Sequence, residues 1–173
     1  LITIIRPNLI IECGTAFGGS ALYFSDLQKT NNIKPSKIIT IDVEAYKNRP
    51  INKYIEYIKG SSTDPKIVKY VTKESKKYKG VMVVLDSCHA AQHVYDELNI
   101  YSKIVTKHSY IIVEDSNLGN LVMTDVKDLL GKEVGPAAAI KTFLKENNNF
   151  VSDVICERQL LSTNIGGYLF KAE

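Results

Sequence analysis

The chain has 173 residues, which is enough for one domain with a sizeable core and too few for two domains of ordinary size. Its hydrophobic content of 45% and charged content of 24% are typical of a globular protein, and no apolar run approaches the roughly 18 residues that a membrane span needs. The formal net charge of +3 is too small to indicate a nucleic-acid-binding protein, and most of the lysines are spread along the chain.

The cysteines are three in number and far apart in the sequence: Cys13, Cys88 and Cys156. This pattern argues against a disulfide framework or a zinc knuckle and favours a reducing compartment, so we expect a cytoplasmic protein. The chain begins at Leu1 without a Met, and its first ten residues read like the continuation of something upstream. We therefore expect a single domain over residues 1–173 that lacks an N-terminal segment.

Short apolar runs alternate with helical patterns along the whole chain. Taken in order, they predict strand 8–13, helix 20–31, strand 36–42, strand 53–60, helix 64–75, strand 80–87, helix 91–105, strand 109–115 and helix 135–147. Asp64 and Pro65 are typical of a helix start, as cap and first-turn residue. Two last strands, 150–156 and 166–172, close the chain without room for a helix between them.

This order of elements predicts an α/β fold. Continuous apolar strands separated by helices favour a parallel sheet covered on both faces. The last two strands predict an antiparallel hairpin added at the edge of that sheet. We expect a Rossmann-like fold with a mostly parallel seven-stranded sheet; a (β/α)₈ barrel normally needs about 250 residues.

The stretch "IECGTAFGGSALYF" (11–24) is typical of a strand, a tight turn and a helix that begins near a ligand. Its glycine spacing differs from the dinucleotide fingerprint, and no lysine follows to make a phosphate-binding loop. Most of the strand ends carry a carboxylate, which suits a cationic ligand or a metal better than a phosphate. S-adenosylmethionine fits, with Glu12 orienting the turn or the methionine part and Asp42 accepting from the ribose hydroxyls. The alternative is that the glycines serve only a tight turn and helix packing.

Three further carboxylates follow neighbouring strands of the predicted sheet: Asp86, Glu114 and Asp115. We expect them to converge at one edge of the pocket, where hard oxygen ligands favour Mg²⁺ over zinc. Such an ion lowers the pKa of a substrate hydroxyl. The alternative is that these are ordinary acids that cap loops and helices.

Two histidines and a cysteine near the same strand end have several possible roles. His89 and His93 lie four residues apart, so they fit a zinc pair, a general base at His89, or simply a polar helix start. Cys88 fits a nucleophilic or redox role or a passive thiol, and we favour the passive thiol.

Six stretches together resemble one family: "RPNLIIECGTAFGGSALYF", "GSSTDPKIV", "VMVVLDSCHAAQHVYDEL", "YIIVEDSN", "GPAAAIKTFL" and "NIGGYL". The chain resembles the cephalosporin hydroxylase and rhamnosyl O-methyltransferase family, whose members are S-adenosylmethionine-dependent enzymes of Rossmann-like fold. The resemblance implies a Rossmann-like class I methyltransferase fold for this chain. The resemblance implies a cofactor site of Glu12, Gly14, Thr15, Gly18, Gly19, Ser20, Asp42, Gly60, Ser61 and Asp86. It also implies that Asp86, Glu114 and Asp115 bind the metal.

The sequence departs from the family pattern at one chemical position. The family motif reads Asp-Ser-Asp-His, and Cys88 stands where the second Asp, a candidate general base, is expected. His89 can replace that base, the metal alone can suffice, or the protein can bind without turnover. The stretch 116–136 is the expected substrate-facing loop.

These observations predict a Mg²⁺-dependent O-methyltransferase that acts on a sugar or a glycosylated small molecule, with Asp86 and His89 as catalytic residues. The alternatives are a non-catalytic S-adenosylmethionine-binding or assembly domain, a NAD(P)-dependent oxidoreductase, and a hydroxylase, for which we find no two-His-one-carboxylate iron motif. We expect no nucleic-acid or membrane partner, and a homo-oligomer is possible.

Overall fold

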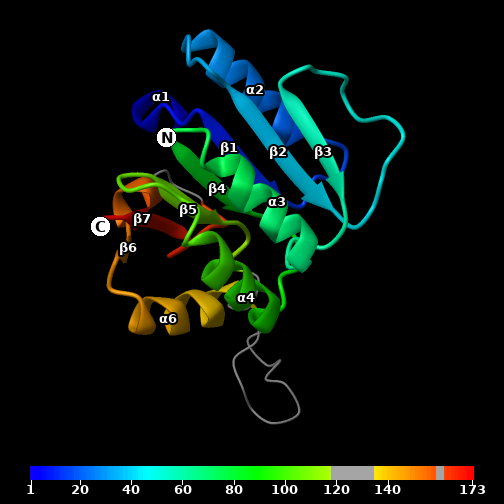
Figure 1. Ribbon diagram of the computed structural model, residues 1–173. Helices are drawn as coiled ribbons and strands as arrows, with labels where there is room; N and C mark the ends of the chain where they lie inside the picture. Colours follow the sequence, from blue (N-terminus) through cyan, green and yellow to red (C-terminus); the bar gives the residue numbers. More distant parts are fainter. Residues whose placement is uncertain (118–134, 159–161) are drawn as a thin grey trace.

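The structure is a computed structural model that describes residues 1–117, 135–158 and 162–173 (Figure 1). Its strands are β1 (Leu9–Cys13), β2 (Lys37–Asp42), β3 (Ile55–Lys59), β4 (Val81–Leu85), β5 (Tyr110–Val113), β6 (Phe150–Ser152) and β7 (Tyr168–Lys171). Its helices are α1 (Ile2–Ile5), α2 (Gly19–Thr30), α3 (Pro65–Ser75), α4 (Ala91–Tyr101), α6 (Pro136–Glu146) and the 3₁₀ helix η1 (Val154–Glu157). Among the described residues, no helix is long and apolar enough to cross a membrane.

The seven strands form one sheet in the order β3-β2-β1-β4-β5-β7-β6. Strands β1 to β5 are parallel, and β7 pairs antiparallel with both β5 and β6. This arrangement confirms the predicted α/β fold, with its mostly parallel sheet and its C-terminal antiparallel pair. Because β1 pairs with both β2 and β4, its last residue, Cys13, lies beside Ile41 and Leu85. The carboxyl ends of the three central strands therefore lie side by side.

The side chains of each strand alternate between two apolar cores. Leu9, Ile11 and Cys13 of β1 face the core that contains Val71 of α3 and apolar residues of α4 and α6. Ile10 of the same strand faces the second core, where α1 and α2 pack. Helices therefore cover both faces of the sheet, as Figure 1 shows. This burial on both faces explains why the strands are apolar without interruption.

Several local details differ from the sequence prediction, and one is that α4 ends at Tyr101 and not at Val105. The predicted strand 150–156 ends at Ser152, because the Asp153 carboxylate accepts a hydrogen bond from the backbone N–H of Ile155 at 3.0 Å and begins η1. The short helix α1 was not predicted. By contrast, the predicted start of α3 is confirmed, since Asp64 accepts from Lys66 and Ile67 backbone N–H groups and Pro65 is the first helical residue.

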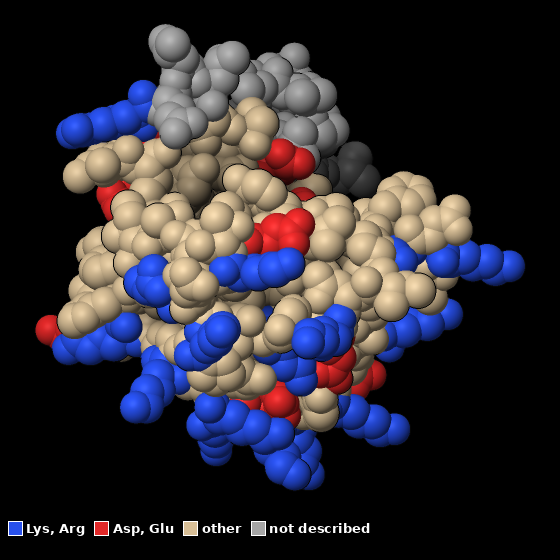
Figure 2. Space-filling view, turned by 90° about the horizontal axis from the view of Figure 1, so that it is seen from above, with Lys and Arg blue, Asp and Glu red and all other residues tan. Residues whose placement is uncertain are grey.

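Charged side chains of both signs lie on the face of the molecule that Figure 2 shows. Figure 2 shows Lys and Arg side chains spread over much of the face seen from above, with Asp and Glu side chains among them. The three cysteines are free: Cys13 is buried, Cys88 is exposed and Cys156 is half-buried.

Gly14 occupies a position where a side chain has no room. Its φ is +97°, and an added Cβ would lie 1.8 Å from the backbone oxygen of Asp86. We predict that Gly14→Ala destabilises the protein by more than about 2 kcal/mol, because both strain and a backbone clash result. Denaturant unfolding measures this change.

Gly19→Ala is the matched control. An added Cβ at Gly19 meets nothing within 4 Å, and Gly19 is the first residue of α2. We expect its effect to stay within about 1 kcal/mol, since alanine favours a helix over glycine. Equal losses in the two variants would contradict the close backbone approach at Gly14.

Candidate active site

A cavity of about 380 Å³ lies at the carboxyl ends of β1, β2, β3 and β4. In open parallel sheets this edge is the usual place for ligands. Several residues predicted for the cofactor site line this cavity: Gly14, Thr15, Ser20, Asp42, Gly60, Ser61 and Asp86. The structure therefore brings together residues that are up to 72 positions apart in the sequence (Gly14 to Asp86, 86 − 14 = 72).

Other lining residues were not predicted as cofactor contacts. They are mostly chain neighbours of the strand ends, and they are Ala16, Ile41, Val43, Tyr46, Ser62, Ser87, Cys88 and His93. Position next to a predicted strand end could have identified most of them. Tyr46 and His93 come instead from the β2–β3 connection and from α4. The sequence analysis considered His93 only as part of a zinc pair, and no motif in the sequence points to Tyr46.

Asp42 organises the turn after β1. Its Oδ2 accepts hydrogen bonds from the backbone N–H groups of Thr15 at 2.9 Å and Ala16 at 2.7 Å. Its Oδ1 accepts from the Glu44 backbone N–H at 2.8 Å. Ala16 has a φ of +43°, an unusual conformation for a residue with a side chain, which these bonds help to hold. Asp42 thus shapes the turn after β1, and its contact with a ribose stays a prediction.

Glu12 lies beneath the turn instead of lining the cavity. It is buried, and its carboxylate accepts from the hydroxyls of Ser20 and Thr40, the latter at 2.5 Å. The Thr40 hydroxyl in turn contacts that of Thr15 at 2.6 Å. Burial raises the pKa of the Glu12 carboxyl, and the Ser20 and Thr40 hydroxyls oppose this effect. Together these bonds tie the start of α2 to β1 and β2.

Gly18 and Gly19 also lie outside the cavity lining. Gly18 is the N-cap of α2 with a φ of +78°, and an added Cβ would contact the Tyr57 hydroxyl at 2.9 Å. These two glycines let the chain turn from β1 into α2. A direct role of either glycine at the cofactor stays a prediction.

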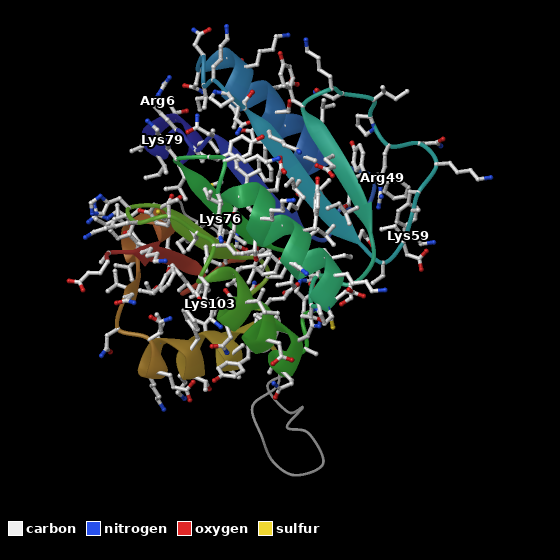
Figure 3. All side chains as sticks on the ribbon, viewed as in Figure 1. Arg6, Arg49, Lys59, Lys76, Lys79 and Lys103 are labelled. Atoms are coloured by element: carbon white, nitrogen blue, oxygen red, sulfur yellow. The ribbon has the colours of Figure 1, made fainter. Side chains whose placement is uncertain are left out.

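Arg49 connects the turn after β1 to the β2–β3 connection. Figure 3 shows Arg49 between β3 and the connection that precedes it. Its Nε donates to the Ala16 carbonyl at 2.9 Å, and its Nη2 donates to the Glu44 carbonyl at 2.8 Å and lies 3.6 Å from Asp42 Oδ2. Its guanidinium also lies over the rings of Tyr46 and Tyr57. A single arginine in a connecting segment carries no sequence motif, so sequence reasoning missed it.

A second group lies at the edge of the cavity. Asp86, His89 and Asp115 each offer one ligand atom, and these atoms all lie within 4.8 Å of one another. His89 Nε2 lies 3.6 Å from Asp86 Oδ1 and 3.9 Å from Asp115 Oδ2. Among the described residues this nitrogen is buried and has no hydrogen-bond partner. Two carboxylates and an unpaired imidazole nitrogen fit a divalent cation, and we call these residues the cation group.

Glu114, the third acid predicted for the metal, has another partner. Its Oε2 accepts from the Asn164 side-chain amide at 2.8 Å, and Asn164 Oδ1 accepts from the Asp115 backbone N–H at 2.9 Å. Its charge still acts on the site: burial first, and then the Glu114 charge, raise the pKa of Asp86 to about 6. The assignment of Glu114 as a metal ligand stays a prediction.

His93 belongs to a different group from His89. Its Nε2 lies 3.2 Å from the Ser62 hydroxyl and 3.3 Å from Glu97 Oε1. The Ser87 hydroxyl donates to the same Glu97 oxygen at 2.7 Å, and Glu97 is fully buried. Within the described ranges, the two histidines therefore have separate partners, which does not favour a zinc pair. Most of the predicted substrate-facing loop, 116–136, lies outside the described residues.

A family model described as "Rhamnosyl O-methyltransferase/CmcI" matches residues 1–172. The chain is 31% identical over 149 residues to a rhamnosyl O-methyltransferase of Mycobacterium tuberculosis (strain ATCC 25618 / H37Rv). This match covers 84% of this chain and 58% of that protein. It is 30% identical over 159 residues to a rhamnosyl O-methyltransferase of Mycobacterium leprae (strain TN). This match covers 90% of this chain and 67% of that protein. The chain thus spans 58% of the length of the first of these relatives.

Solved structures with the same fold include CmcI and MycE. An apo structure of CmcI matches with a TM-score of 0.71 at 18% identity and covers 99% of this chain and 67% of that one. A CmcI structure with Mg and SAM matches with a TM-score of 0.70 at 17% identity, covering 99% and 68%. A MycE structure with Mg and SAH matches with a TM-score of 0.60 at 13% identity, covering 99% and 47%. These likenesses confirm the methyltransferase fold.

We predict that Asp86→Asn stabilises the protein at pH 7.5. The folded-state pKa of Asp86, about 6, is higher than the ordinary value of 3.8, so the ionised group disfavours folding above pH 6. The melting temperature of the variant should exceed that of the wild type by a few degrees at pH 7.5. The difference should shrink as the pH falls below 6, where the wild-type carboxyl takes up its proton.

The exposed Asp26 of α2 provides a control for the loss of one negative charge. Asp26→Asn should leave the melting temperature nearly unchanged at both pH values. If Asp86→Asn melts at or below the wild-type temperature at pH 7.5, burial and the charge of Glu114 do not destabilise the ionised Asp86 carboxylate as assigned.

Proposed function

Since the chain belongs to the rhamnosyl O-methyltransferase/CmcI family, we propose that it is an S-adenosylmethionine-dependent O-methyltransferase. We propose a hydroxyl of a sugar or of a glycosylated small molecule as its acceptor and Mg²⁺ as its cation. One observation carries the proposal: Asp86 lines the cavity and also belongs to the cation group. A methyl donor in the cavity and a hydroxyl at the cation therefore meet at Asp86.

The cavity suits a ligand that carries positive charge and no phosphate. Its lining in the described part of the chain includes Asp42 and Asp86 and contains no Lys or Arg. S-adenosylmethionine supplies an electrophilic methyl group on a sulfonium centre, and acidic side chains favour that positive charge. Burial and like charges at Asp86 further favour a cationic neighbour, because they disfavour its ionised form when it is alone.

Each part of the turn has a role in this proposal. The backbone at Gly14 and Thr15, together with Ser20, holds the methionine and ribose parts of the cofactor. Asp42 Oδ1 accepts one backbone hydrogen bond and keeps a lone pair for a ribose hydroxyl. Gly60 and Ser61, at the end of β3, lie at the adenosine part. Glu12 holds Ser20 in place from below.

The acceptor hydroxyl loses a proton during methyl transfer. A divalent cation lowers the pKa of such a hydroxyl when it is bound there. Asp86 and Asp115 hold the cation, and the sequence prediction adds Glu114 as third ligand and His89 as general base. His89 Nε2 faces both aspartates, so it is placed to take the proton only while it does not itself coordinate the cation.

One observation favours a second candidate, a cofactor-binding protein without turnover. Cys88 stands at the exposed rim of the cavity where the resembling family has an aspartate. A thiol in that place is a weaker proton acceptor than a carboxylate. An oxidoreductase is less favoured, because the glycine spacing after β1 is not that of a dinucleotide-binding turn.

We predict that S-adenosylhomocysteine binds and that NADH does not, as measured by calorimetry on the chain. With S-adenosylmethionine, Mg²⁺ and a set of glycoside acceptors, we expect release of S-adenosylhomocysteine. Asp86→Ala should abolish this turnover and change the affinity for S-adenosylhomocysteine by less than about threefold, or roughly 0.7 kcal/mol. Asp26→Ala is the matched acid control and should retain turnover.

The outcomes separate the candidates. Binding of NADH alone would exclude the methyltransferase proposal. Tight binding of S-adenosylhomocysteine without transfer to any acceptor would favour the non-catalytic protein. Full activity of Asp86→Ala would refute the role of Asp86 at the cation.

Cys88→Asp tests the departure from the family motif. Cys88 is exposed, so replacing its thiol with a carboxylate does not disturb the core. We expect the variant to keep or raise the rate of methyl transfer, because the added carboxylate restores a proton acceptor next to the cation group. A rate measured against pH would reveal the new group. A fall in the rate would show that the thiol itself takes part.

A further inference from the structure

His93 is held in one orientation at the wall of the cavity. Its Nε2 lies 3.2 Å from the Ser62 hydroxyl and 3.3 Å from Glu97 Oε1, and both of these residues are buried. The Ser87 hydroxyl donates to the same Glu97 oxygen at 2.7 Å, so the carboxylate is itself held in place. Because Ser62 follows β3 and Ser87 follows β4, these contacts join α4 to two strand ends.

These contacts determine which ring nitrogen of His93 carries a hydrogen. A carboxylate oxygen only accepts, so a bare Nε2 would place two acceptors 3.3 Å apart. The neutral imidazole therefore keeps its hydrogen on Nε2 and has a free lone pair on Nδ1. Nδ1 forms no hydrogen bond with a described residue and is open to solvent. Since His93 lines the cavity, this nitrogen is an acceptor for a ligand there.

The part of the cavity next to His93 is the part that we propose for the adenosine. Gly60 and Ser61 line it from the end of β3, directly before the serine that contacts His93. Val43 and Tyr46 line the same cavity and add apolar and aromatic surface, which suits a flat base. The 6-amino group of adenine carries N–H donors, and these need an acceptor once the base leaves water.

We infer that His93 Nδ1 accepts a hydrogen bond from the 6-amino group of adenine and thereby makes the site specific for an adenosyl cofactor over an inosyl one. This inference rests on the proposed function, because it concerns the cofactor of the same cavity. Hypoxanthine has an oxygen at its 6 position, so Nδ1 would face a second acceptor. A site that hydrogen-bonds a ligand group discriminates strongly against an analogue without that group, because its own polar atoms then stay unpaired.

Calorimetric titrations with two ligands test this specificity without any change to the protein. The ligands are S-adenosylhomocysteine and S-inosylhomocysteine, which differ only in the base. We expect the wild type to bind the adenosyl ligand at least about tenfold more tightly, which corresponds to about 1.4 kcal/mol. The titrations are made at pH 8, where the neutral imidazole is the usual form of histidine.

His93→Phe removes both ring nitrogens and keeps a ring. We expect it to weaken binding of S-adenosylhomocysteine at least about tenfold and to change binding of S-inosylhomocysteine by less than about threefold, so the specificity is lost. His108→Phe is the matched control, because His108 is exposed and precedes β5 at the opposite edge of the sheet. This control should keep the wild-type ratio of affinities. Circular dichroism confirms that each variant is folded.

Nitrogen-15 magnetic resonance of the wild type tests the contact itself, and its result does not depend on whether His93→Phe folds. The chain has three histidines, so the imidazole region of the spectrum is simple. We expect a hydrogen on His93 Nε2 and none on Nδ1 in the free protein. The Nδ1 resonance should move when S-adenosylhomocysteine is added and stay in place when S-inosylhomocysteine is added.

Three results would overturn the inference. The first is equal affinity of the wild type for the two ligands, and the second is an Nδ1 resonance that S-adenosylhomocysteine does not move. The third is a folded His93→Phe protein that loses the same factor of affinity for both ligands, which would make His93 a purely structural residue. None of these affects the proposed function, provided that the wild type binds S-adenosylhomocysteine. If the wild type binds neither ligand, the proposed function itself is refuted.

Discussion

The close approach of β1 and β4 at their carboxyl ends is the constraint on which the rest of the site depends. The Asp86 backbone N–H donates to the Cys13 carbonyl at 2.7 Å, and Gly14 leaves no space for a side chain next to the Asp86 carbonyl. The contact is made by backbone atoms, so it does not vary with rotamers. It fixes Gly14, the first residue of the turn after β1, against Asp86, which also belongs to the cation group. A methyl donor and an acceptor hydroxyl can be aligned only if these two parts keep a constant separation.

The negative charge at this edge costs stability when no ligand is present. Glu12 and Asp86 both have a raised pKa because of burial, and Glu114 adds repulsion at each of them. The chain limits this cost in two ways. Hydroxyls of Ser20 and Thr40 satisfy Glu12, and Arg49 lies 3.6 Å from Asp42. The cation group has no such neutralising partner among the described side chains apart from His89, so the remaining repulsion is available to favour a bound cation.

Much of the fold could be predicted from the sequence, because apolar runs and helical spacings report burial on two faces directly. The cavity followed from the rule that parallel strands end together, which placed Gly14, Asp42 and Asp86 around it. Local hydrogen bonds were harder to predict: the Asp153 cap shortened the strand predicted over 150–156. The partners of Glu114 depend on Asn164, which is 50 positions away and carries no motif.

Position 88 departs from the motif of the resembling family, whereas His89 agrees with that motif. A thiol stands at position 88 in place of a carboxylate, so less of the proton's removal in the proposed reaction falls to that side chain. More of it then depends on a bound cation, which lowers the pKa of an acceptor hydroxyl. His89 Nε2 lies 3.6 Å from Asp86 Oδ1 and 3.9 Å from Asp115 Oδ2, so the imidazole of the motif stays next to the two acids although the neighbouring carboxylate is missing.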